Sequence, residues 1–271
     1  MAPDSRHFHI IADFHTHTTY SHGKGSVEDN VRAGRERGLR FVGIADHGPA
    51  NLFGIGVKDL DAYQDIRREA ERCNLKYGDV EALTCAEANI ITRDGDLDVP
   101  LAVARNLDVV LAGLHVMIRG KTASDSWVLA GRNFIARYSR WLRRRARVDN
   151  TKAVIEAVMK NPIDVITHPD FGVSIDTEEL ASACARTGAA LEINARHASS
   201  SEDFIKTAAK QGVLFCVGSD AHCPEEVGDL ECALHAAARS GLASDRIVNS
   251  AETFGERKVN WRNKWWKKVD L

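Results

Sequence analysis

Two histidines, one residue apart, follow the first apolar stretch of the chain. Residues 8–14 are mostly apolar and are predicted to form a buried strand, with His15 and His17 at its end and His22 close behind. Side chains two positions apart in an extended chain point to the same side. His15 and His17 can therefore present two imidazoles to one metal ion. A lone histidine is more often an ordinary core or surface residue, so this hypothesis depends on the rest of the chain.

The elements that must position these histidines alternate between short strands and helices. Seven apolar runs are candidate strands, at 8–14, 41–45, 80–86, 108–114, 163–167, 189–193 and 213–218. Helical patterns lie near 26–38, 59–76, 120–147, 150–160, 176–187, 201–211 and 225–240. Such alternation predicts a parallel α/β sheet covered on both faces. Seven units in one run favour a closed or distorted barrel. The alternative, an open doubly wound sheet, usually has a Gly-rich loop after the first strand, and this sequence lacks one.

One domain covering residues 1–271 is the simplest interpretation, because no Pro-, Gly- or Ser-rich linker interrupts the pattern. The net charge of -2 gives no overall attraction to nucleic acid or anionic membranes. No stretch reaches the roughly 20 apolar residues of a membrane helix. The N-terminus lacks the apolar core of a signal peptide, and the six cysteines contain no CxxC pair. We therefore expect a cytoplasmic protein without a disulfide framework or a membrane partner.

Polar residues follow every predicted strand at the same end. Besides the three N-terminal histidines, they are Asp46, His47, Glu87, His115, His168, Asn194, Arg196, Asp220 and His222. In a βα barrel the C-terminal ends of the strands converge on one mouth, where active sites form. Chance is a poor explanation for seven histidines, two carboxylates and an arginine at that end. The sequence therefore predicts a shared metal site at the barrel mouth.

The number of ligands indicates more than one metal ion. A zinc ion takes four ligands, whereas seven imidazoles and two carboxylates are enough for two or three divalent ions. A carboxylate such as Glu87 can bridge two of them. Histidine-rich ligation favours Zn, Mn or Fe over Mg or Ca. Clustered ions suit the hydrolysis of phosphate esters, because one activates water and the others neutralise the phosphoryl and leaving oxygens.

Taken together, these motifs resemble the PHP (polymerase and histidinol phosphatase) superfamily over about residues 9–250. The motifs are HxH near the N-terminus, a strand ending in Asp-His, a Glu at the third strand, single His residues after the fourth and fifth, and a late Asp-x-His. Glu87-Ala-Asn-Ile with Asp94-Gly-Asp-Leu-Asp, and Thr167-His168-Pro169, look most similar to its small stand-alone phosphatases, the histidinol-phosphatase-like branch. The resemblance implies a distorted (β/α)7 TIM-like barrel with a trinuclear metal site at its C-terminal mouth.

The resemblance also implies a ligand set for each of three ions. The sets are His15, His17, Glu87 and Asp220; Glu87, His115 and His168; and His22, His47 and His222. The spacing from His17 to His22 varies within the superfamily, which makes His22 the least secure ligand. Asp46 is expected to orient a ligand histidine. Arg196 is a candidate clamp for phosphate, with a surface ion pair as the alternative. His197 is expected to be simply exposed, with a substrate contact as the alternative.

The expected activity is a metal-dependent phosphoesterase that hydrolyses a small phosphomonoester with metal-activated water. Glu87, Asp220 and Arg196 are the residues expected to act at the reacting phosphate. Two alternatives stay open: a phosphodiesterase or exonuclease acting on nucleotides or nucleic acid, and a non-catalytic metal-binding module that recruits a partner. All the expected ligands are present, which favours catalysis. The sequence predicts no particular substrate or oligomeric state.

Residues 119–149 depart from the barrel pattern, because they hold nine Arg and Lys against two Asp, a surplus of seven positive charges. This segment begins just after His115 and should lie beside the metal mouth. It could be a lid that attracts small phosphates, or a wall that binds a nucleic-acid backbone. The aromatic side chains available for base stacking are Trp127, Phe134, Tyr138 and Trp141. The helical spacing of the last three favours packing on the barrel, so we expect a packed helical insertion that adds positive potential.

The C-terminal segment 258–271 is also aromatic and basic. It contains Trp261, Trp265 and Trp266 among several Arg and Lys residues. We expect these tryptophans to dock on the barrel rather than to bind a membrane or a partner, because amphipathic chain ends usually dock.

Overall fold

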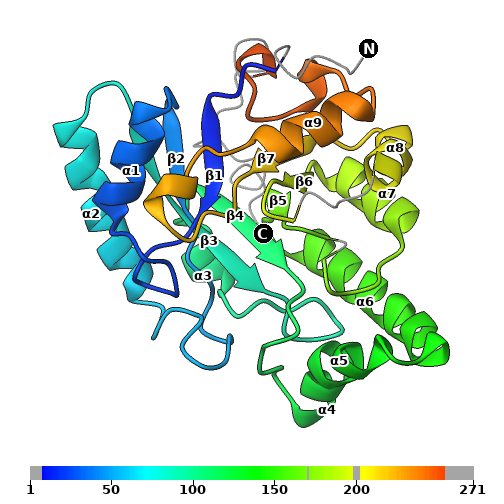
Figure 1. Cartoon of the computed structure of the whole chain (residues 1–271). Coiled ribbons are helices and arrows are strands. Elements are labelled where there is room, and N and C mark those ends of the chain that lie inside the picture. The colour runs from blue at the N-terminus through cyan, green and yellow to red at the C-terminus, as the bar shows by residue number, and fades with distance from the viewer. Residues whose placement is uncertain (1–7, 170, 198–201, 254–271) are drawn as a thin grey trace.

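A sheet of parallel strands forms the centre of the molecule (Figure 1). The computed structural model describes residues 8–169, 171–197 and 202–253. Seven strands in these residues are hydrogen-bonded in chain order. They are β1 (Ala12–Thr16), β2 (Phe41–Ile44), β3 (Glu81–Asn89), β4 (Val109–Gly113), β5 (Val165–Ile166), β6 (Ala190–Asn194) and β7 (Phe215–Gly218). Thr16 bridges Ala221 just beyond β7, so the sheet curves into a nearly closed barrel. The predicted distorted seven-stranded barrel is confirmed.

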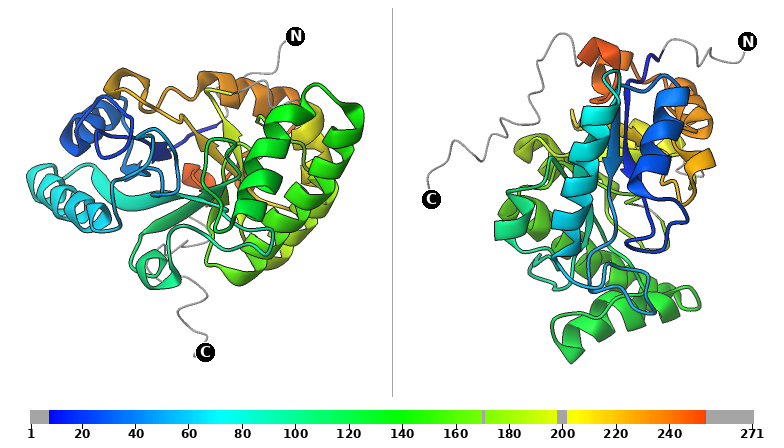
Figure 2. Two further views of the ribbon diagram at one scale, coloured as in Figure 1. Left: turned by 90° about the horizontal axis from the view of Figure 1, so that it is seen from below. Right: turned by 90° about the vertical axis from the view of Figure 1, so that its left-hand side faces the viewer.

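Helices cover the outer face of this sheet, as the two views in Figure 2 show. The α-helices are α1 (Val27–Glu36), α2 (Ala62–Lys76), α3 (Leu101–Ala104), α4 (Ala123–Asp125), α5 (Arg132–Ala136), α6 (Arg140–Lys160), α7 (Thr177–Thr187), α8 (Glu202–Lys210) and α9 (Glu231–Arg239). Shorter turns are the π-helix η2 (Ser126–Gly131) and the 3-10 helices η3 (Pro224–Glu226) and η4 (Ser244–Arg246). None of the helices in the described part of the chain is long and apolar enough to cross a membrane.

Local hydrogen bonds and one glycine define the ends of α1 and α7. Ser26 begins α1 with a capping box, in which its hydroxyl accepts from the N–H of Asp29 and the Asp29 carboxylate accepts from the N–H of Ser26. The carboxylate of Asp176 caps the start of α7 in the same way, by accepting from the N–H of Glu179. Gly188 ends α7 at a positive φ of 83°, a conformation that glycine adopts without strain.

Two apolar clusters lie on opposite faces of the strands. The larger one fills the space between the strands and the helices. The smaller one fills the barrel interior and includes Leu83 and Cys85 of β3. Because alternate residues of a strand share a face, Glu87 and Asn89 continue this interior face toward the end of β3. The barrel therefore has an apolar interior that becomes polar at its C-terminal mouth.

β1 breaks the regular alternation of a strand. Its pairing with β2 shifts register between Asp13 and Thr16. Phe14 belongs to the interior apolar cluster, yet the adjacent His15 also contacts interior residues at the mouth. In a regular strand these neighbours would point to opposite faces. The irregularity therefore lets both Phe14 and His15 face the interior, and His15 reaches the mouth.

The basic segment contains several helices where the sequence predicts one over 120–147 and another over 150–160. The structure instead has α4, η2 and α5, a break at residues 137–139, and then α6, which runs through the predicted boundary to Lys160. Ser139 starts α6, because its hydroxyl accepts from the N–H of Leu142. We call residues 123–148 the arm. It projects from the barrel at the lower right of Figure 1, on the side toward which β3 and β4 point. The short helix α3 lies outside the predicted helical segments.

The aromatic side chains of the arm are exposed, so the prediction that they pack on the barrel is wrong. Trp127, Phe134, Tyr138 and Trp141 expose 55%, 58%, 78% and 63% of their surface. The buried face of the arm is made by other residues, among them Leu129, Ala136 and Ala146. Helical spacing shows which side chains share a face, but it does not show which face meets the barrel. The C-terminal segment 258–271 lies outside the described residues.

Candidate metal centre

Glu87, at the end of β3, lies fully buried at the centre of the predicted ligands. Its Oε1 lies 2.9 Å from Nε2 of His168 and 3.2 Å from Nε2 of His115. Its Oε2 lies 2.8 Å from Nδ1 of His47 and 3.3 Å from Nε2 of His15. One carboxylate therefore contacts imidazoles from four different strand ends, which is the position of a residue that bridges metal ions.

Asp220, just beyond β7, is the second carboxylate of the cluster. Its Oδ1 lies 3.3 Å from Nε2 of His17, 3.6 Å from Nε2 of His15 and 3.5 Å from Nδ1 of His222. Asp220 has a positive φ of 56°, and so does His168, at 25°. Such a conformation costs a non-glycine residue about 1–3 kcal/mol and is found most often at functional sites. Two of the three described non-glycine residues with positive φ thus belong to this cluster.

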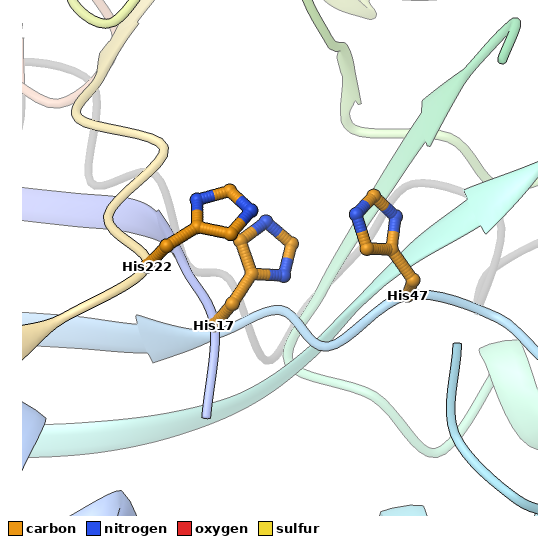
Figure 3. A group of neighbouring side chains, drawn as sticks. All are labelled: His17, His47 and His222. Carbon is orange, nitrogen blue, oxygen red and sulfur yellow. The ribbon is translucent and has the colours of Figure 1, made fainter. Parts of the chain in front are cut away.

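His17, His47 and His222 point toward one another at the mouth (Figure 3). The ring centroid of His17 lies 4.5 Å from that of His47 and 4.5 Å from that of His222. The His22 ring lies 4.3 Å from the His222 ring and 5.0 Å from the His47 ring. The structure thus brings together His22, His47 and His222, the predicted third set, and places the His17 ring against those of His47 and His222.

Three groups of three residues could each hold a metal ion, because their ligand atoms lie within 4.8 Å of one another. The groups are His15, His17 and Glu87; His47, Glu87 and His115; and His17, His47 and His222. They overlap the three predicted sets without matching them residue for residue. His47 is shared between two groups, and His17 stands where the prediction has His22.

Several buried polar atoms of the cluster lie close to other ligand atoms but form no hydrogen bond of suitable geometry in the described part of the chain. They are Nε2 of His15, both ring nitrogens of His17, Nδ1 of His47 and Oε2 of Glu87. Leaving a buried polar atom unpaired costs about 1–3 kcal/mol. Divalent ions would satisfy these atoms together, and imidazole with carboxylate is a donor set suited to Zn, Mn and Fe. The residues therefore fit a cluster of metal ions.

Burial and neighbouring charges set the protonation of this cluster. Burial, together with the nearby His47, lowers the pKa of His17 well below its usual value. Burial and the charges of His222 and His47 lower the pKa of His22 to about 4. Burial raises the pKa of Glu87, but the surrounding histidines outweigh it and hold that pKa well below its usual value. The neighbouring carboxylates, which outweigh burial, instead raise the pKa of His15 well above its usual value and also raise the pKa of His168. Metals bind neutral imidazoles and ionised carboxylates, so an ion must displace protons from these two rings.

Glu192, in the middle of β6, is a buried carboxylate that the sequence analysis does not single out. Its Oε1 accepts from the Nδ1–H of His15 at 2.6 Å, which leaves Nε2 of His15 facing Glu87. Its Oε2 accepts from the backbone N–H of His168 at 2.8 Å. A carboxylate behind a ligand histidine fixes the ring and its tautomer. The only sequence signal is a single Glu within the apolar run 189–193.

Asn89 and Asp98 support His115 from the other side of the mouth. The Nδ1–H of His115 donates to Oδ1 of Asn89 at 2.7 Å. The side-chain amide of Asn89 donates to Oδ2 of Asp98 at 2.6 Å, and the Asn89 backbone N–H donates to Oδ1 of Asp98 at 2.7 Å. These bonds leave Nε2 of His115 facing Glu87. Asn89 and Asp98 lie within the motifs Glu87-Ala-Asn-Ile and Asp94-Gly-Asp-Leu-Asp. Nothing in the sequence predicts the hydrogen bonds that link them to His115.

Asp46 contacts the loop that carries two ligand histidines, and it contacts no imidazole ring in the described structure. Its carboxylate accepts from the backbone N–H of Thr18 at 2.8 Å, from the Thr18 hydroxyl at 2.6 Å and from the Ser21 hydroxyl at 2.5 Å. These donors lie in the loop between His17 and His22. Asp46 therefore fixes the backbone that carries two of the histidines, and it does not bond to an imidazole ring. The sequence shows that Asp46 is near the site, but not which groups it faces.

A cavity of about 490 Å³ opens over the histidine cluster. Lys24 and Arg196 line it together with apolar side chains that include Met117 and Phe171. Arg196 forms the ion pair predicted as its alternative role, with Glu226 at 2.8 Å, and it also lines the cavity.

His197 is not simply exposed, contrary to expectation. Its ring stacks on Phe171 with centroids 3.6 Å apart, and its Nε2 lies 3.4 Å from Oδ2 of Asp220. His197 and Phe171 both line the cavity, so this stacked pair forms part of its wall.

The PHP domain family model matches residues 13–262. The chain belongs to the PHP domain family. A probable phosphatase of Thermoanaerobacter sp. (strain X514) is 32% identical over 252 residues, which cover 89% of this chain and 91% of that protein. A probable phosphatase of Acetivibrio thermocellus is 31% identical over 259 residues, with coverage of 91% and 94%. The predicted superfamily is thus confirmed, and the names of these relatives agree with the predicted phosphatase class of hydrolase.

A solved structure shares the fold of this PHP protein. It is histidinol phosphate phosphatase from Lactococcus lactis subsp. lactis Il1403, complexed with Zn, L-histidinol and phosphate. The TM-score is 0.58, and the alignment covers 86% of this chain and 94% of the other. At 14% sequence identity, this likeness shows a common fold alone.

Proposed function

We propose that this protein is a metal-dependent phosphatase that hydrolyses a small phosphomonoester and uses two to three divalent ions of Zn, Mn or Fe. The main support is the cluster of seven histidines around Glu87 and Asp220, in which several buried ligand atoms form no hydrogen bond of suitable geometry in the described structure. Membership of the PHP family and the names of the relatives support the same activity. The cavity over the cluster gives a substrate access to it.

The residues that would hold the ions are the nine predicted ligands. They are His15, His17, His22, His47, Glu87, His115, His168, Asp220 and His222. When bound, divalent ions lower the pKa of water and neutralise phosphoryl oxygens. Glu192, Asn89 and Asp98 would hold the imidazoles His15 and His115 in the orientation that exposes Nε2 to the ions.

Arg196 is the candidate for direct contact with the phosphate. It lines the cavity, and its guanidinium is the kind of donor that binds phosphate oxygens in pairs. Its partner Glu226 also accepts from the backbone N–H of His222 at 2.8 Å. Glu226 therefore ties Arg196 to the loop that carries a ligand. We propose that Arg196 stabilises the charge on the phosphoryl group, with Lys24 adding positive potential at the same cavity.

A small phosphomonoester fits this site better than a bulky substrate. A volume of about 490 Å³ falls within the range of small-molecule pockets. The solved phosphatase that shares the fold was crystallised with L-histidinol and phosphate, so histidinol phosphate belongs among the first substrates to test. The apolar wall formed by Met117 and Phe171 gives the leaving group a surface to contact.

The experiment is an activity screen of protein loaded separately with Zn, Mn or Fe, against matched panels of phosphomonoesters and phosphodiesters. We expect release of phosphate from monoesters, and loss of that activity when a chelator removes the metals. Faster cleavage of diesters would favour the phosphodiesterase alternative. Metal binding without turnover of any substrate would favour the non-catalytic module.

A further inference from the structure

The arm combines exposed rings with cationic side chains that have no carboxylate partner. Among the described residues, no carboxylate lies within ion-pair distance of five arginines of the arm. These are Arg137, Arg140, Arg143, Arg144 and Arg145. Other basic groups of the segment are paired: Arg132 with Asp149, and Arg147 with Asp176, each at 2.6 Å. The unpaired arginines therefore present net positive charge to solvent.

Two of the unpaired arginines lie against exposed rings of the arm. The guanidinium of Arg137 lies over the Phe134 ring, 3.9 Å from its centroid, and 5.1 Å from the centroid of Tyr138. The guanidinium of Arg145 lies 5.2 Å from the Trp141 centroid. Flat rings and guanidinium groups thus alternate along α5 and the first turns of α6. A ligand for this surface must offer flat groups and anions at similarly short intervals.

We propose that the arm binds single-stranded nucleic acid. Bases would stack on Tyr138, Trp141 and their neighbours, and phosphates would bind the unpaired arginines between them. This occupant matches the charge of the arm. Residues 119–149 have a net charge of +7, and the rest of the chain therefore has -9, since the total is -2. A polyanion would be attracted to this segment and repelled by the body of the protein.

Two other occupants fit the arm less well. A lipid surface would require the rings to insert below the headgroups, but Arg137 and Arg145 lie against the rings that would insert. A second copy placed on a two-fold axis would bring five unpaired arginines against five others. Single-stranded nucleic acid instead places a base and a phosphate within reach of each ring and its arginine. This inference is independent of the phosphatase proposal, because the arm and the metal cluster share no residue.

The test is fluorescence anisotropy of metal-loaded full-length protein with a fluorescein-labelled 15-nucleotide oligothymidine. Phosphorothioate linkages prevent cleavage of the probe during the measurement. We expect Tyr138→Ala with Trp141→Ala to weaken binding by more than about fivefold, since each stacked base contributes measurably. Changing Arg143, Arg144 and Arg145 to Ser should reduce the slope of log K against log salt by about 2, at roughly 0.7 per phosphate contact.

The matched control changes Arg68, Arg72 and Arg105 to Ser, which removes the same charge from surfaces away from the arm. This control should bind the oligonucleotide like the wild type. Equal weakening by the two triple variants would mean non-specific attraction and would overturn the proposal. So would wild-type protein that binds no oligonucleotide at low salt. Vesicles with anionic lipid and light scattering of the free protein test the other occupants. Binding to vesicles but not to the oligonucleotide, or dimers lost in the arm variants, would also overturn it.

An assay of a small phosphomonoester separates this proposal from the proposed function. Both triple variants should keep full phosphatase activity and metal content if the arm is a separate binding surface. Loss of oligonucleotide binding with unchanged monoester kinetics supports the inference whatever the natural substrate of the metal cluster is. A higher KM for the monoester in the arm variant alone would instead show that the arm acts as a lid for the phosphatase site. That result would overturn the proposal that the arm is a separate binding surface.

Discussion

The metal mouth and the arm differ in where they place their polar and aromatic groups. At the mouth, Glu87 is fully buried and surrounded by imidazoles from four other strand ends. On the arm, Tyr138 and Trp141 are exposed, and nearby arginines lack carboxylate partners in the described structure. The mouth buries groups that normally face water, and the arm exposes groups that normally avoid it. Both arrangements cost stability, which is why both indicate binding.

The difference lies in what holds each region in place. Glu192, Asn89 and Asp98 fix the imidazoles of the mouth from behind, so those ligands are oriented before an ion binds. On the arm, exposed rings lie beside arginines, Phe134 beside Arg137 and Trp141 beside Arg145. The mouth is therefore built for a small, precisely placed ligand. The arm is suited to a larger and more adaptable one.

The largest effect should follow Glu87→Gln. This change keeps the shape of the side chain but removes the charge that four imidazoles face. We expect loss of more than one metal ion and a fall in phosphatase activity greater than the roughly 10–100-fold typical of residues behind the ligands. Elemental analysis and steady-state kinetics measure both. Glu36→Gln, at an exposed site, is the control, and a variant at position 87 with full metal content would contradict the bridging role.

His22→Ala should have a smaller and more local effect. The His22 ring lies beside His222 and His47, at the edge of the cluster. We expect metal content to fall by about one ion, with the fold retained and substrate binding weakened. Elemental analysis, circular dichroism and KM for a monoester test this. His235→Ala removes an exposed histidine of α9 as the control. Unchanged metal content and kinetics would remove His22 from the site.

Glu192→Gln tests whether a residue that hydrogen-bonds ligand histidines affects metal binding as strongly as a ligand does. An amide can still accept from the N–H of His15 or His168, but it lacks the negative charge that strengthens those bonds. We expect metal affinity to fall about 10–100-fold, with a smaller change in activity at saturating metal. Competition with a chelator measures the affinity. Wild-type affinity in this variant would show that Glu192 has only a structural role.

Much of the mouth is predictable from the sequence because barrel geometry constrains it. Parallel strands in sequence order bring their C-terminal ends together, so His115 and His168 must meet once the strands are recognised. The supporting contacts are not predictable in the same way. Glu192 interrupts an apolar strand, and nothing in the sequence shows that it lies under His15. The irregularity of β1 also depends on pairing with β2.

The arm shows the limit of periodicity. The spacing of Phe134, Tyr138 and Trp141 predicts one helix through all three, but Tyr138 lies in the break at residues 137–139 between α5 and α6, and the rings face solvent. Which face of a helix is buried depends on the surface it meets. For the arm, the buried contacts include the ion pair of Arg132 with Asp149 and the bonds between Asn133 and Asn150. These polar pairs between neighbouring helices have no signature in a hydrophobic pattern.

The smallest effect should follow the removal of an arm aromatic, measured as stability. Tyr138→Ala should change the free energy of unfolding by less than about 1 kcal/mol, because an exposed ring loses little on truncation beyond its contact with Arg137. Phe14→Ala, in the fully buried barrel interior, should cost about 3–5 kcal/mol. Urea unfolding of both variants at fixed metal concentration provides the comparison. If Tyr138→Ala destabilised the protein as much as Phe14→Ala does, Tyr138 would be a packing residue. The aromatic rings of the arm would then stabilise the fold, and their presence would not require a ligand.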